Sequence, residues 1–167
     1  MLDALHAWAV VPAAVGACCM AADRGRTRGP EIVSSVFMVL GMMDMLRAIP
    51  ALVPVAWTAI LVVVGICLAV LSRLRTPRTS MTMHAALGSI VMGALLLMAR
   101  PEMALEGDAA HHDGGSASLA FAFHLGAAVF VVGSFVLSAR RGERLFARIQ
   151  YGTMGLATLA MVVPLFF

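Results

Sequence analysis

The sequence predicts an all-α integral membrane protein, a bundle of six transmembrane helices with both termini outside. Of its 167 residues, 61% are hydrophobic and only 13% are charged, and the mean hydropathy is +0.93. An ordinary soluble domain carries about twice that share of charge, and one this small could not bury so much apolar surface. The same composition excludes an intrinsically disordered chain, which needs low hydrophobicity and high charge.

Six apolar segments divide the chain and predict a single transmembrane domain over residues 1–167. Each segment is 18 to 21 residues long, and a helix needs about 20 residues to cross a bilayer. A helix also satisfies its backbone hydrogen bonds internally, as a chain inside lipid must. The expected spans are about 2–22, 32–49, 55–72, 81–98, 119–137 and 149–167.

The arginines predict the orientation of these spans. All twelve basic residues are arginine, and ten of them lie in the first, third and fifth connections, whereas the fourth connection is mainly acidic. Cytoplasmic loops carry the excess of basic residues, so we expect a multi-pass protein of the cytoplasmic (plasma) membrane with its odd-numbered connections inside. Because the arginines are divided among three short loops, no nucleic-acid surface is expected.

A copper site is the most specific chemistry that the sequence offers. The chain has thirteen methionines, and thioether sulfur with imidazole is the ligand set that suits Cu(I), while imidazole with carboxylate suits Cu(II). Several such side chains fall at the outer ends of the expected spans or in the outer loop. The predicted metal-site residues are His6, Met42, Asp44, Met45, Met98, His111, His112 and His124.

Each of these residue types also has a simpler interpretation. Methionine fills gaps in apolar packing, and the pair His111 and His112 lies in a Gly/Asp-rich loop that water can solvate. Asp44 lies inside the second apolar segment, where an acidic side chain is usually paired or functional. Arg47, three residues later, is an obvious partner, so a structural pair and a site residue both stay open for Asp44.

Two further functions compete with copper binding or handling. The chain has no recognisable catalytic motif, and its small size favours a non-catalytic accessory subunit of a larger membrane complex, such as a respiratory assembly. Partners would be other membrane subunits or a second copy of the chain. A stripe on the fifth segment would pack on that partner, with lipid as the alternative neighbour; it consists of Phe121, Gly126, Phe130, Gly133 and Phe135.

A single haem is the lesser alternative, with His6 and His124 as its axial ligands, because both histidines lie near the outer side. A smaller group of soft side chains lies at the inner side instead, and it would suit a transporter. That group is Cys18, Cys19, Met20, Met81, Met83 and His84.

The methionine patterns of two segments resemble a known family. They are Met38-x-x-x-Met42-Met43-x-Met45 and the stretch from His84 through Met92 to Met98, followed by a His/acidic outer loop. These motifs are similar to those of an actinobacterial family of small Met/His-rich polytopic membrane proteins of unknown function. The resemblance runs from Glu31 to the end of the chain. Ser34 and Ser35 stand where the family pattern has a histidine, and the resemblance implies the topology and composition rather than an activity.

Overall fold

The fold is a bundle of α-helices, and a computed structural model describes it over residues 2–22, 29–47, 51–74, 79–98 and 113–163. Six helices and no strands lie in these ranges, so the predicted all-α class is confirmed. The helices are α1 Leu2–Ala22, α2 Gly29–Met45, α3 Pro54–Leu74, α4 Thr79–Met98, α5 Asp113–Ala139 and α6 Leu145–Val162.

Three helices have ends that lie three or more residues from those expected. α2 stops at Met45 rather than near residue 49, because the chain tightens into a turn in which Arg47 N–H donates to the Asp44 carbonyl at 3.1 Å. α5 begins six residues early, at Asp113. α6 begins at Leu145, within the arginine-rich stretch that composition had assigned to a loop.

Arg148 explains part of that early start. Its Nε–H donates to the Ser138 carbonyl at 2.7 Å, which satisfies a carbonyl in the last turn of α5. The arginine therefore belongs to the helical hairpin that joins α5 to α6.

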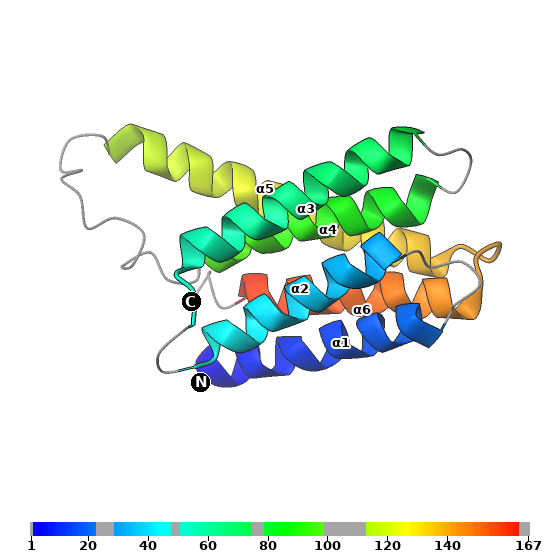
Figure 1. The fold of residues 1–167 in the computed structure, drawn as a ribbon. Helices are drawn as coiled ribbons and strands as arrows, with labels where there is room; N and C mark the ends of the chain where they lie inside the picture. The colour runs from blue at the N-terminus through cyan, green and yellow to red at the C-terminus, as the bar shows by residue number, and fades with distance from the viewer. Residues whose placement is uncertain (1, 23–28, 48–50, 75–78, 99–112, 164–167) are drawn as a thin grey trace.

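The helices pack mainly as antiparallel neighbours (Figure 1). α3 packs along α4, α5 packs along α6, and α1 packs along the other side of α6. α2 lies against α1, α3 and α4, while α4 also contacts α5 and α6. We call the end where α2, α4 and α6 finish the outer end, following the arginine distribution, and the opposite end the inner end; the outer end is at the left of Figure 1.

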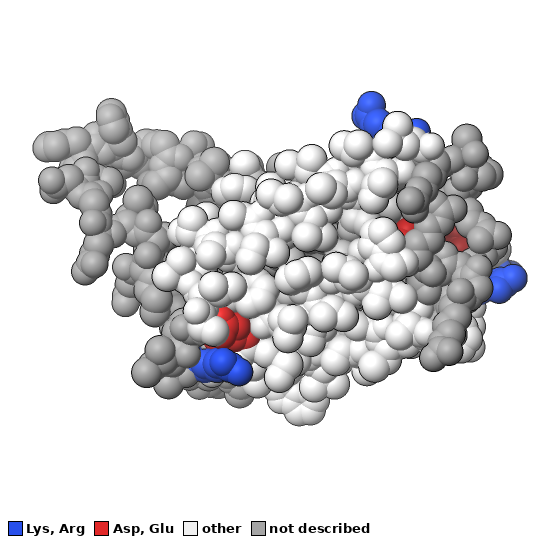
Figure 2. All heavy atoms as spheres, viewed as in Figure 1, with Lys and Arg blue, Asp and Glu red and all other residues white. Residues whose placement is uncertain are grey.

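Within the described residues, three helical stretches are long and apolar enough to cross a membrane: Pro54–Leu74, Met81–Met98 and Phe121–Ala139. Half of the Met81–Met98 window is buried inside the bundle, but only 28% and 22% of the other two. α4 is therefore an interior helix, while α3 and α5 turn most of their apolar side chains outward. On the face shown in Figure 2, the described charged side chains lie toward the ends of the bundle, with an uncharged belt between them. A lipid environment fits this distribution.

Candidate functional site

A buried cluster of methionines occupies the interior between α2, α4 and α6. Its five members are each at most 5% exposed and belong to one continuous apolar core, against which Met45 also packs. They are Met38, Met42, Met92, Met154 and Met161, and this set is called the methionine cluster below. Met42 and Met161 lie within three residues of the ends of α2 and α6, or about 5 Å at 1.5 Å per residue. The cluster therefore reaches the outer end of the bundle.

The structure brings only part of the predicted copper site together. Met42 is buried in the core, and Met45 is half-buried against it. Met98 is half-buried at the end of α4 but does not join the cluster, and His124 is half-buried on α5. The remaining histidines cannot be placed, since the His6 side chain, His111 and His112 lie outside the described part of the chain.

The Asp44 carboxylate faces the start of α3 rather than the methionine cluster. One carboxylate oxygen accepts the backbone N–H of Ala51 at 2.8 Å, and the other accepts the N–H of Leu52 at 3.0 Å. The second oxygen also accepts the indole N–H of Trp57 at 2.8 Å. Arg47 is more distant, with 3.9 Å between its guanidinium and the carboxylate, and its side chain is 66% exposed.

These contacts give Asp44 a structural role. Its carboxylate links the end of α2 to the connecting turn and to the first turns of α3, and it is only 5% exposed. The predicted pair with Arg47 is present, but three shorter hydrogen bonds hold the carboxylate more firmly. Sequence reasoning missed Trp57 and the two backbone donors. An acidic residue beside a helix C-terminus opposes the helix dipole, and that conflict was the available signal for other partners.

The predicted haem ligands and the predicted His/carboxylate metal ligands of the outer end are less well supported by the packing. His6 and His124 lie on α1 and α5, and α6 packs against both of these helices and lies between them. Among the described residues, no three His, Cys, Asp or Glu side chains gather into a potential metal site. The soft ligands available near the described outer end are thus mainly thioethers.

Buried polar side chains collect toward the inner end, where the sequence had indicated a group of soft side chains that includes Met20 and His84. Ser34 and Ser89 join α2 to α4 through their hydroxyls at 2.6 Å, and the Thr82 hydroxyl donates to the Glu31 carboxylate at 2.5 Å. The Ser35 hydroxyl donates to the Met20 sulfur at 2.9 Å. Glu31, Ser34 and Ser35 recur on one face of α2 inside an apolar stretch, which is the signal that could have identified this interface.

Gln150 is the exception to this pairing. Its side chain is 1% exposed, and neither its amide nitrogen nor its amide oxygen has a hydrogen-bond partner in the described part of the protein. An unpaired buried polar group costs about 1–3 kcal/mol. We therefore expect Gln150→Met, which keeps a similar volume, to raise the melting temperature of the purified protein in detergent. A lower melting temperature would show that a bound water or ligand pairs this amide.

No protein-family model, curated protein or solved structure matches this chain. The functional argument therefore depends on the side chains and their geometry.

Proposed function

We propose that this chain is a six-span protein of the cytoplasmic membrane that binds copper through methionine side chains at the outer end of its bundle. The observation that carries the proposal is the methionine cluster: thioethers from α2, α4 and α6 lie in one buried core that reaches that end. The site would be centred on Met42 and Met161, with Met45 at its edge. Met98 and the outer-side histidines His6, His111, His112 and His124 would complete the ligand set or capture the metal.

The chemistry favours the reduced ion. Thioethers are soft, uncharged ligands that select Cu(I), and an apolar core disfavours hard, strongly hydrated ions. Asp44 then supports the site from outside the ligand set, because its carboxylate fixes the end of α2 on which Met42 and Met45 lie.

Two neighbouring methionines on α2 provide a variant and a matched control to test copper binding. Met42 is 2% exposed and Met43 is 52% exposed, and replacement of either by leucine nearly conserves volume. We expect Met42→Leu to weaken Cu(I) binding and Met43→Leu to leave it unchanged, measured by competition of the purified protein with a chromophoric Cu(I) chelator. Equal affinities in both variants, or a protein that retains no copper after reconstitution, would contradict the proposal.

The topology makes a separate prediction. Cysteines introduced at Arg26 and Gly114, in a background without the three native cysteines, should differ in reactivity toward an impermeant thiol reagent added to intact cells. Gly114 should react from outside, and Arg26 should react only after the cells are opened, because the arginine-rich loops are expected inside. Labelling of Arg26 from outside would reverse the orientation.

An accessory-subunit function is the second candidate, and the exposed face of α5 favours it. Its apolar side chains include Phe121 at 69% exposure, and the start of α5 diverges from the rest of the bundle in Figure 1. The predicted stripe needs one correction: Phe130 is only 7% exposed and stacks on His84, so it faces inward. Purification in mild detergent tests this function, and a chain that runs alone at every salt concentration argues against it.

A further inference from the structure

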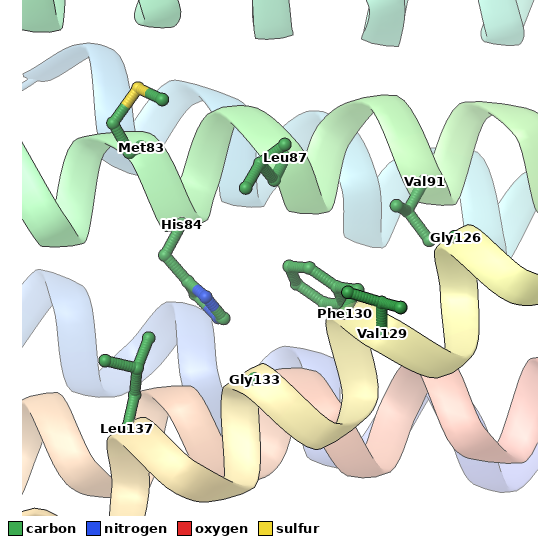
Figure 3. A pocket seen from close by; sticks show the side chains of 9 residues that line it. All are labelled: Met83, His84, Leu87, Val91, Gly126, Val129, Phe130, Gly133 and Leu137. Atoms are coloured by element: carbon green, nitrogen blue, oxygen red, sulfur yellow. The ribbon is translucent and has the colours of Figure 1, made fainter.

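A groove between α4 and α5 is a feature that copper binding does not explain. It has a volume of about 530 Å³, within the range of about 300–1,000 Å³ typical of small-molecule sites. Its walls are almost wholly apolar and carry no Asp, Glu, Lys or Arg (Figure 3). Its lining includes His84, Leu87 and Val91 on α4 and Gly126, Phe130 and Gly133 on α5.

His84 is the single titratable side chain in this lining. It is 5% exposed, and its imidazole stacks on the Phe130 ring with 4.8 Å between centroids and 19° between planes. Tyr151 meets the imidazole edge-on, also at 4.8 Å. The imidazole and the Phe130 ring therefore form a small, mostly buried aromatic group in the wall of the groove (Figure 3).

The hydrogen bonding of His84 is incomplete. Ser134 Oγ lies 3.5 Å from Nε2, but the Ser134 hydroxyl proton already goes to the Phe130 carbonyl at 2.7 Å. The Ser134 contact is long for a hydrogen bond, and with the hydroxyl proton on the carbonyl it would need the imidazole proton on Nε2. A neutral imidazole protonated at Nε2 keeps a free lone pair at Nδ1, and no described residue supplies a donor to it. An acceptor in a membrane groove is stabilised when a ligand donates to it.

The groove has one polar and one apolar end. His84 lies three residues inside the apolar part of α4, about 5 Å from its start at 1.5 Å per residue. From His84 the groove continues to Val91, about 10 Å farther toward the middle of the bilayer. Gly126 and Gly133 leave this course open, because a Cβ atom at either position would meet nothing within 4 Å.

We propose that this groove binds a membrane quinol, with a ring hydroxyl donating to His84 and the apolar tail lying along α5. A quinol ring is flat, uncharged and a hydrogen-bond donor, which matches the stacked imidazole, the uncharged walls and the unpaired acceptor. A phospholipid headgroup carries a phosphate, and no cationic side chain lines the groove to receive it. This inference concerns a different part of the bundle from the copper site and does not depend on it.

Decylubiquinol, kept reduced, is a suitable probe for the detergent-solubilised full chain. We expect saturable binding by calorimetry, and binding about tenfold weaker for His84→Phe, which keeps the stacking but removes one hydrogen bond. Gly133→Leu should abolish binding because its side chain fills the groove, and it should fold because the space there is open. Val136→Leu, at an exposed position that does not line the groove, is the matched control.

Three results would overturn the quinol site. The first is equal binding by the Gly133→Leu and wild-type chains, and the second is displacement of the probe by dioleoylphosphatidylglycerol, which would assign the groove to phospholipid. The third is a stable dimer that Gly133→Leu separates, which would assign the groove to a second copy of the chain. Thermal unfolding of each variant distinguishes lost binding from lost fold, and Gly133→Leu alone is decisive if His84→Phe does not fold.

Discussion

Asp44→Asn is expected to lower the free energy of unfolding by about 3 kcal/mol, since it disrupts hydrogen bonds to a charged acceptor that are worth about 1.5–3 kcal/mol each. The carboxylate of Asp44 accepts from Ala51 on one oxygen and from Leu52 and Trp57 on the other. An asparagine has one oxygen and one NH₂ group, so at least one of these donors would face another donor. Denaturant unfolding in detergent, followed by circular dichroism, measures the loss.

Arg47→Ala is the control for charge. The guanidinium of Arg47 is 3.9 Å from the carboxylate and largely exposed, so its removal should cost less than about 1 kcal/mol. Trp57→Phe removes a single donor from the same carboxylate and should fall between the two. If Asp44→Asn unfolds like the wild-type protein yet loses copper, the carboxylate belongs to the metal site and its structural role is wrong.

The outer end shows what the sequence could and could not predict. Met42 and Met45 were both predicted at the outer end of the second span, and the structure buries Met42 in the core and packs Met45 against it. Met161 was missed, because its place in the same core as Met42 depends on how α6 packs in the bundle, and that packing is a property of the whole chain. The length of α2 was misjudged for a similar reason: apolar composition continues past Met45, but Asp44 binds the following turn and the helix ends there.

The α4–α5 groove was beyond sequence reasoning for a different physical reason. Small residues often permit close helix contact in membranes, yet Gly126 and Gly133 both face open space. A glycine removes a side chain wherever it lies, and only the path of the neighbouring helix decides whether that space is filled. Phe130 shows the same dependence, since a stripe of aromatic residues on α5 could not reveal which ring would turn inward onto His84.

Gly65 is a position where the space is filled, and Gly65→Ala is expected to destabilise the bundle by about 2 kcal/mol through overpacking. A Cβ atom at Gly65 would lie 2.9 Å from the Ala86 carbonyl oxygen and 2.7 Å from Ile90 Cγ1. The isoleucine can change rotamer, but the carbonyl belongs to the backbone of α4 and can move only with that helix. α3 and α4 pack along one another, so the substitution forces apart a large interface.

Gly133→Ala separates this packing effect from helix propensity. Alanine is favoured over glycine in a helix interior by about 1 kcal/mol, and at Gly133 the added methyl meets nothing within 4 Å. Gly133→Ala should therefore leave the melting temperature unchanged or raise it, while Gly65→Ala lowers it in the same detergent. If both variants shift the melting temperature alike, helix propensity alone accounts for the effect, and the close contact between α3 and α4 contributes nothing to stability.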